Sequence, residues 1–227
     1  MLNREVLTVS LKLFVITAAA ALCLAAVNTV TAPVIAENAA KADTEAQREV
    51  LSAASEFKKS EFSEKDTPEG AAAGVRIESL NVGLDGNGTV GYVVTAVSNA
   101  GYGGDIRVMI GIDKDIKVTR VKILESSETA GLGAKASTPA FSGQYEGRNG
   151  KMEVVKGDAK GENEISAISG ATITSRAVTS CVNAALEQVA AKAADGSADT
   201  AAAVNEKLEE TKKATDMQIN GESGGAK

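Results

Sequence analysis

The strongest hydrophobic pattern in the sequence is an apolar run close to the N-terminus. Residues 13–27 read LFVITAAAALCLAAV, and the apolar segment continues for about 20 residues, enough to cross a bilayer as a helix. Arg4 and Lys12 precede it, and no other lysine or arginine occurs before Lys41. Because positive flanks stay on the cytoplasmic side, we predict a single-pass transmembrane helix at 13–35 of the cell (inner) membrane, with a cytoplasmic N-terminus (1–12) and an extracytoplasmic globular domain.

A cleaved signal peptide is the competing interpretation of this segment. The charged start and the alanine-rich end of the run fit such a peptide. The run is longer than the 7–15 residues of a usual signal-peptide core, and this length favours a retained membrane anchor.

A second helical pattern, of a more polar kind, covers residues 37–62. The segment is rich in Ala, Glu and Lys. Four apolar positions fall on one helix face: Val50, Leu51, Ala54 and Phe57. The sequence TPEG at 67–70 interrupts the pattern. We therefore expect 36–71 to form a solvated helical stalk or linker between the membrane and the domain that follows.

Apolar and polar positions predict β-strands in the middle of the chain. The expected strands are 75–84, 89–97, 106–112, 116–124 and 152–155. The first two flank DGNG and the next two flank DKD, and both sequences are typical of tight hairpin turns. In the strand at 116–124 the apolar positions mostly alternate, which predicts an antiparallel sheet with one buried face.

A helical pattern returns after this strand region. Its apolar stripe consists of Val178, Val182, Ala185, Leu186 and Val189. Residues 191–227 are rich in Ala, Glu, Lys and Gly and predict a frayed helix end and a disordered low-complexity tail. The expected fold class is α+β: one transmembrane helix, then a domain at 72–190 with an antiparallel sheet and a C-terminal helix.

Composition excludes several kinds of function. The net charge of −6 argues against a nucleic-acid partner, because such binding neutralises phosphates with positive side chains. The absence of histidine removes Ser–His and Cys–His nucleophiles and the commonest ligand of transition metals. The two cysteines, Cys23 and Cys181, form no C-x-x-C pair, so iron–sulfur and zinc-ribbon sites are not expected. Any redox chemistry therefore needs an organic cofactor.

One short stretch, SAISGATITS at 166–175, allows two interpretations. Its serines and threonines stand at the start of the last helical pattern, where they could cap the first turn. Its small residues also suit an anion, because they let the N–H groups of a helix start approach a phosphate.

Three motifs occur in order along the chain: GYGGDIRVMIGID, ETAGLG and SAISGATITS. Together they resemble the FMN-binding domain of the G subunit of the Rnf electron-transport complex. The related C subunit of the sodium-translocating quinone reductase is similar. The resemblance covers essentially the whole chain, including the N-terminal membrane helix.

The resemblance implies a flavin site. In this family the last threonine of the S/T-G-A-T sequence, here Thr172, carries FMN through a phosphoester bond. The other cofactor-binding residues that it implies are Ser169, Gly170, Ala171, Thr174, Glu128, Thr129, Gly131, Leu132 and Gly133. Leu132 would cover a face of the flavin ring, and Glu128 or Thr129 would meet its polar edge. No catalytic residue and no metal ligand is expected.

The implied function is electron transfer in a membrane complex that moves electrons between ferredoxin and NAD while an ion is translocated. The implied partners are the other Rnf subunits, the membrane and a flavin transferase that attaches the FMN. Ser166 stands where the family motif commonly has Asp, and Ala130 where the loop commonly has Pro. The Ser166 difference keeps open a membrane-anchored binding or structural domain without flavin. A free-standing FMN reductase is disfavoured, because Glu128 is the only candidate acid.

Overall fold

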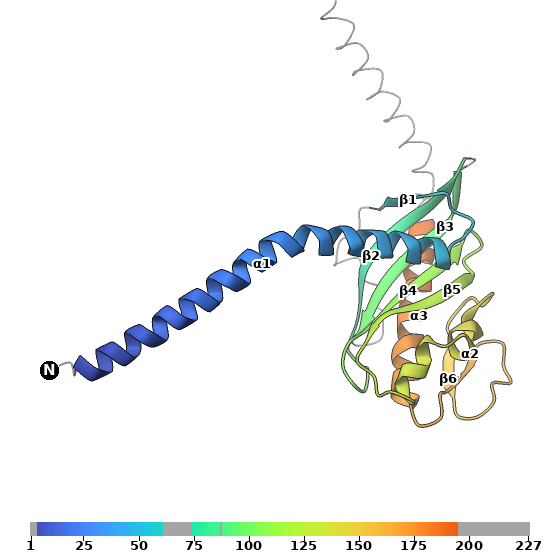
Figure 1. Cartoon of the computed structure of the whole chain (residues 1–227). Coiled ribbons are helices and arrows are strands. Elements are labelled where there is room, and N and C mark those ends of the chain that lie inside the picture. Colours follow the sequence, from blue (N-terminus) through green and yellow to red (C-terminus); the bar gives the residue numbers. More distant parts are fainter. Residues whose placement is uncertain (1–3, 61–73, 87, 195–227) are drawn as a thin grey trace, which may run out of the picture. The chain divides into compact units, whose positions relative to one another are not determined.

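The computed structural model describes residues 4–60, 74–86 and 88–194. It separates into an N-terminal unit that ends at Glu45 and a second unit that begins at Ala46. The elements are α1 (Arg4–Val50), β1 (Glu56–Lys59), β2 (Val75–Asp85), β3 (Gly88–Ser98), β4 (Ile106–Asp113), β5 (Val118–Ser126), η2 (Gly133–Ser137), α2 (Pro139–Ser142), η3 (Gly143–Tyr145), β6 (Glu153–Val155), β7 (Glu164–Ser166) and α3 (Thr172–Ala194) (Figure 1).

The predicted membrane segment is helical and forms part of α1. Among the described residues, α1 is the one helix long and apolar enough to cross a membrane, with a mean hydropathy of 2.2 over its most apolar window. Threonine hydroxyls in this segment donate to backbone carbonyls one turn back in the same helix. Thr17 donates to the Leu13 carbonyl at 3.0 Å, and Thr29 donates to the Ala25 carbonyl at 2.7 Å. These bonds suit a lipid environment, where water cannot serve as the partner.

Five antiparallel strands form the main sheet, in the order β1-β2-β3-β4-β5. The four longer strands were all predicted, and the first two match within one residue at each end. The strand predicted to begin at Ile116 begins at Val118, because Ile116 has a φ of +58° and belongs to the turn. In that turn Asp113 Oδ1 accepts the N–H groups of Asp115 and Lys117, both at 2.9 Å. Asn87, in the first predicted turn, lies outside the described residues.

The helix predicted at 37–62 is wrong beyond Val50. The chain leaves the helix after this residue, and β1 pairs in antiparallel register with β2. The apolar positions assigned to one face of a stalk are instead part of the domain. Val50, Leu51 and Ala54 are buried, and Phe57 packs beside them. These contacts with the sheet outweigh the helical preference of the segment, as tertiary contacts commonly do.

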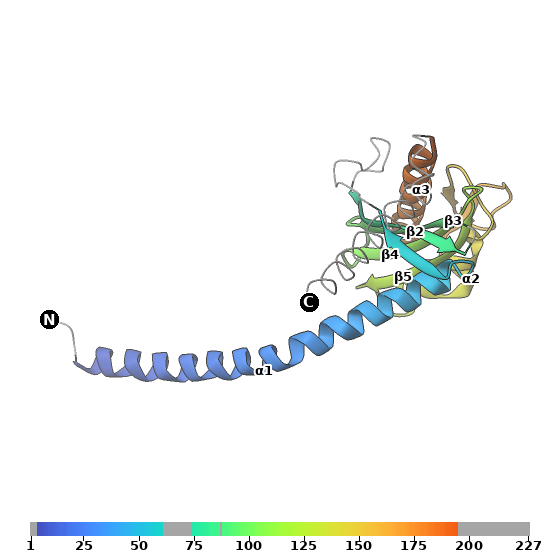
Figure 2. The same ribbon diagram turned by 90° about the horizontal axis from the view of Figure 1, so that it is seen from above.

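The sheet is buried on both faces, so the prediction of one buried face is also wrong. Successive residues of β3 point to different cores. Val94 and Ala96 belong to the larger core, which α3 completes by packing across β2, β3 and β4 (Figures 1 and 2). Val93 belongs to a smaller core, which also contains Met109 of β4 and the buried residues of the segment 46–54.

The C-terminal helix is confirmed as α3, and all five residues of its predicted stripe are buried. The helix includes residues 191–194, which the sequence assigned to the tail, and the remainder of that tail lies outside the described residues. The strand predicted at 152–155 is β6, which pairs in parallel with β7, an element that the sequence did not predict.

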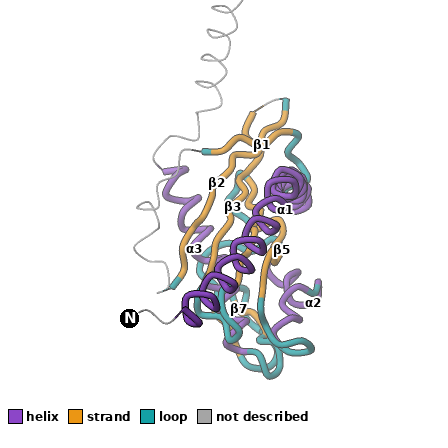
Figure 3. Tube along the Cα trace, turned by 60° about the vertical axis from the view of Figure 1, so that its left-hand side comes forward, coloured by secondary structure: helices purple, strands orange, loops and turns teal. Residues whose placement is uncertain are grey.

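The register of β4 and β5 decides where the loops meet. Ile106 at the start of β4 pairs with Ser126 at the end of β5. The β3–β4 connection and the segment that follows β5 therefore lie at the same end of the sheet. Figure 3 colours such connecting loops teal.

Candidate functional site

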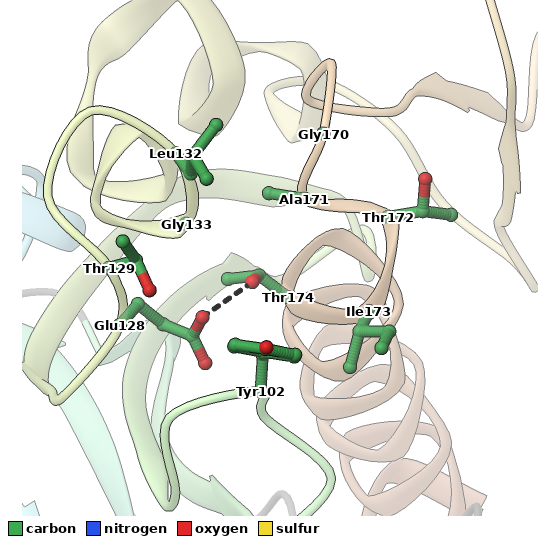
Figure 4. A pocket seen from close by; sticks show the side chains of 10 residues that line it. All are labelled: Tyr102, Glu128, Thr129, Leu132, Gly133, Gly170, Ala171, Thr172, Ile173 and Thr174. Carbon is green, nitrogen blue, oxygen red and sulfur yellow. Dashed lines mark hydrogen bonds between the residues drawn. The ribbon is translucent and has the colours of Figure 1, made fainter.

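A pocket of about 570 Å³ lies where three segments meet at this end of the sheet. The segments are the β3–β4 loop, the loop after β5 and the start of α3. Its lining residues are Tyr102, Glu128, Thr129, Leu132, Gly133, Gly170, Ala171, Thr172, Ile173 and Thr174 (Figure 4). The volume falls in the range of small-molecule and cofactor sites.

The Glu128 carboxylate connects the three segments. Its Oε1 accepts the backbone N–H of Gly103 in the β3–β4 loop at 3.0 Å. Its Oε2 accepts the hydroxyl of Thr174 in the first turn of α3 at 2.7 Å, the bond drawn dashed in Figure 4. We call Glu128, Gly103 and Thr174 the carboxylate clamp. Both bonds are made to a charged acceptor and are therefore stronger than ordinary hydrogen bonds.

Two glycines leave room for this carboxylate. A Cβ atom at Gly133 would stand 2.7 Å from Thr174 Oγ1 and 2.8 Å from Glu128 Cβ. A Cβ atom at Gly101 would stand 2.8 Å from Glu128 Oε1. Side chains larger than hydrogen at these positions would displace the clamp, so both glycines are needed for close packing.

The start of α3 gives Ser175 a structural role other than the predicted capping. Ser175 Oγ accepts the N–H of Ile168 and donates to the Ala171 carbonyl, both at 3.0 Å. Gly170, with a φ of +77°, provides the left-handed residue just before the helix. Ser169 is exposed and lies outside the pocket lining. The Ser175 hydroxyl therefore ties the helix to the turn before it and caps no N–H group of α3, while the Thr174 hydroxyl belongs to the clamp.

Thr172 has neither of these roles. Its side chain is half-buried and lines the pocket. Within the described part of the chain its hydroxyl makes no hydrogen bond. Figure 4 shows the side chain directed away from Glu128 and Thr174. Of the two threonines at the start of α3, Thr172 is therefore the one whose hydroxyl has no partner among the described residues.

The structure brings together eight of the ten residues that the sequence implied for the site; Ser169 and Gly131 are the two that do not line the pocket. Two lining residues were missed, Tyr102 and Ile173. Both are strongly exposed, 73% and 52% respectively. Two features of the sequence could have indicated them: Tyr102 is an aromatic residue between the glycines of GYGG, and Ile173 is a large apolar residue among the small residues of the helix start.

Ser166, at the position where the family motif commonly has Asp, is part of the local framework. Its hydroxyl accepts the N–H of Ala159 at 2.8 Å. Its backbone is held by both ends of the Gln144 amide, which accepts the Ser166 N–H at 2.8 Å and donates to the Ser166 carbonyl at 3.3 Å. The side chain at this position thus stabilises the turn beside β7.

The pocket suits a flavin mononucleotide in several respects. Tyr102, Ile173 and Leu132 (43% exposed) offer apolar surface to a flat ring. The first N–H groups of α3 have no acceptor within the helix and point toward an anion placed beside Thr172. The residues present therefore fit FMN.

Comparison with known proteins agrees with this geometry. Residues 101–187 match the family described as the FMN-binding domain. The chain is 42% identical to the G subunit of the Na(+)-translocating ferredoxin:NAD(+) oxidoreductase complex of Acetobacterium woodii, over 81% of this chain and 91% of that one. It is 36% identical to the G subunit of the proton-translocating ferredoxin:NAD(+) oxidoreductase complex of Clostridium ljungdahlii, over 73% and 82% of the two chains. It is 33% identical to the G subunit of the ion-translocating oxidoreductase complex of Methanosarcina acetivorans, over 84% and 97%. The chain belongs to the family of G subunits of the Rnf complexes, the ion-translocating ferredoxin:NAD oxidoreductases.

Proposed function

We propose that this chain is an electron-carrying subunit of an ion-translocating ferredoxin:NAD oxidoreductase complex, and that it carries FMN covalently through a phosphoester bond to Thr172. The family supports the role in the complex, and the match to the FMN-binding domain supports the cofactor. One observation carries the choice of residue: of the two threonines of the α3 start that line the pocket, Thr172 is the one whose hydroxyl is unbonded in the described part of the chain.

The linkage is chemically compatible with the start of α3. The Thr172 Oγ–H bond and one P–O bond of the incoming flavin phosphate break and an Oγ–P bond forms; the threonine proton leaves with the oxygen displaced from phosphorus, so that the chain formally gains one FMN and loses one water. The product keeps an anionic phosphate beside the positive end of the helix dipole, where a negative charge is favourable. Bound FMN supplies the electron acceptance and release; the protein supplies its position and surroundings.

The attachment itself needs a second protein. In the described residues, no carboxylate or amine lies within hydrogen-bond distance of the Thr172 hydroxyl to remove its proton. The Glu128 carboxylate already accepts the Thr174 hydroxyl. A separate flavin transferase is therefore the proposed partner, together with the other subunits of the complex.

The membrane topology completes the proposal. The apolar helix α1 anchors the chain by a single pass, with the N-terminus in the cytoplasm and the FMN domain outside. A covalent bond suits an extracytoplasmic site, because a lost cofactor could not readily be replaced there. A cysteine placed in the exposed 156–158 loop should react with a membrane-impermeant thiol reagent in intact cells if this orientation holds, and only after lysis if it is reversed.

The decisive experiment is the intact mass of the full chain, purified in detergent after co-expression with a flavin transferase. Wild type should exceed the polypeptide by one FMN less one water and show a fluorescent band on a denaturing gel. Thr172→Ala should lack both signals, and Thr44→Ala, at an exposed threonine of α1, should keep them. Unmodified wild type would favour the flavin-free domain, and modification that persists in Thr172→Ala would place the bond on another hydroxyl.

A further inference from the structure

We propose that Glu128 is a positioning residue for flavin attachment, an inference that rests on the proposed function. Its carboxylate holds the β3–β4 loop and the first turn of α3 at a fixed separation. By doing so it keeps the pocket open and directs the Thr172 hydroxyl to the side where the phosphate is attached. Glu128 would act through the geometry of its neighbours, without contacting the reacting atoms.

The two bonds of the clamp join parts of the chain that are distant in sequence. Gly103 precedes Glu128 by 25 residues, and Thr174 follows it by 46. No ladder of the main sheet reaches these groups, since the paired strands end at Ser98 and Ser126. The carboxylate therefore provides a polar connection between loops that the sheet leaves unpaired.

Packing around the clamp restricts the carboxylate to this arrangement. Each oxygen has a different partner, and Thr174 is only 1% exposed. The close approach at Gly133 and Gly101 places backbone against both sides of the side chain. A carboxylate with both oxygens engaged and glycine backbone close beside it has less freedom to rotate, so the bonds restrict the separation of the loops although Glu128 itself is half-exposed.

Because both residues belong to α3, the direction of the Thr174 side chain determines the direction of the Thr172 side chain. Successive residues of an α-helix are about 100° apart, so residues two apart point in directions about 200° apart. When the clamp holds Thr174 inward, Thr172 must point away from it, as Figure 4 shows. The same bond occupies the Thr174 hydroxyl, so the clamp selects which of the two threonines is available to the transferase.

The test uses the full chain with its transferase and compares variants of the clamp. Glu128→Ala removes both bonds, and Glu128→Gln keeps the shape but loses the charge. Thr174→Val removes the hydroxyl, and Thr174→Ser restores it. The matched control is Glu125→Gln, at an exposed carboxylate three residues upstream whose partner is Arg107 at 3.4 Å. For each variant we would measure the initial rate of flavin incorporation by intact mass, and the thermal unfolding of the flavin-free protein.

We expect flavin incorporation to slow by about tenfold or more in Glu128→Ala and Thr174→Val, because a lost hydrogen bond to a charged group corresponds to a change of this size. Glu128→Gln should be intermediate, and Thr174→Ser and Glu125→Gln should resemble wild type. Wild-type rates in Glu128→Ala would overturn the proposal. So would a Thr174→Ser variant as slow as Thr174→Val, because it would show that the packing of the methyl group matters and the hydroxyl does not.

Hydrogen exchange on the flavin-free protein tests the clamp separately from flavin attachment. In Glu128→Ala, the amides of 101–104 and 172–175 should exchange faster, while those of the buried strand β4 remain unchanged. If wild type carries no flavin at all, the proposed function fails, but this exchange pattern would still show whether the carboxylate holds the two segments. Unchanged exchange in both segments would refute the positioning role.

Discussion

Replacing Leu51 by alanine should destabilise the domain more than its place in a predicted stalk would suggest. Leu51 is 1% exposed and lies in a notch of the sheet made by two glycines that face each other across β2 and β3, Gly83 and Gly91. A Cβ atom at Gly83 would be 2.5 Å from Leu51 Cδ2, and one at Gly91 would be 3.1 Å from Leu51 Cδ1. Both methyl groups of the leucine thus fill space that side chains would otherwise occupy.

The magnitude follows from this burial. Truncation of a buried leucine to alanine costs about 2–5 kcal/mol, depending on how far the site can collapse. The notch is walled by strand backbone, which cannot collapse easily, so we expect a loss of about 3 kcal/mol or more in the free energy of unfolding. That loss is a large part of the roughly 5–15 kcal/mol that a domain possesses. The exposed neighbour Ser52 is the control, and Ser52→Ala should change stability by no more than about 0.5 kcal/mol.

A double-mutant cycle makes the argument specific. Gly83→Ala alone should be destabilising by about 1–3 kcal/mol, because its methyl group overlaps the leucine. In the Leu51→Ala background the same methyl group enters vacated space, so the two losses should not add, and the coupling should reach about 1 kcal/mol or more. Pulse proteolysis in urea on the detergent-solubilised chain measures all four proteins. Additive losses, or a Leu51→Ala loss as small as that of the Ser52 control, would refute the packing of this segment on the sheet.

Other parts of the structure lead to further predictions. Gly133→Ala should displace the carboxylate clamp and lower flavin loading several-fold, measured by intact mass. Gly157→Ala, where φ is +89° and a Cβ atom would meet open space, should cost about 1 kcal/mol of strain and leave loading unchanged. Burial raises the pKa of Cys181 to about 12 from its ordinary value of 9.0. In a Cys23→Ser variant, the Cys181 thiol should therefore resist a disulfide reagent at pH 8 until the chain unfolds. Above about pH 9 the free energy of unfolding should fall, because the unfolded thiol releases its proton there and the folded thiol does not. Tyr145→Phe should cost about 1 kcal/mol in urea unfolding through the lost 2.8 Å bond between Tyr145 and the Thr179 hydroxyl.

The elements that the sequence predicted well are those whose signal is local. The strands β2 and β3 carry their own apolar pattern and are joined by a turn with typical residues, so neighbouring positions contain most of the information. The apolar run of α1 is similarly self-contained. Prediction failed where a distant partner decides the outcome. Nothing in EFKK at 56–59 distinguishes a helix from an edge strand until β2 is present to pair with it.

The second core shows the same limit on the opposite face of the sheet. The pattern in the strand at 116–124 suggested one buried face, and the apolar residues near position 50 suggested a stalk with an apolar stripe. Each pattern was real, but the two belong together. Gly111 of β4 lets the Val50 carbonyl approach the sheet, and the hydroxyl of Thr119 in the neighbouring strand β5 donates to it. Two segments 69 residues apart complete each other, and neither pattern alone identifies its partner.

For the site, the sequence supplied the residues, and the structure distinguished their roles. The stretch SAISGATITS offers several hydroxyls, and periodicity alone establishes only that Thr172 and Thr174 cannot point the same way on a helix. Which of them turns inward depends on a carboxylate 46 residues away and on the glycine that makes room for it. Of the two interpretations of the stretch, capping finds no support in the bonds of Ser175, and phosphate binding stays a prediction. Ser175 ties the helix to the turn before it and Thr174 bonds the Glu128 carboxylate, which leaves Thr172 with an unbonded hydroxyl, the group to which we propose that the flavin phosphate is attached.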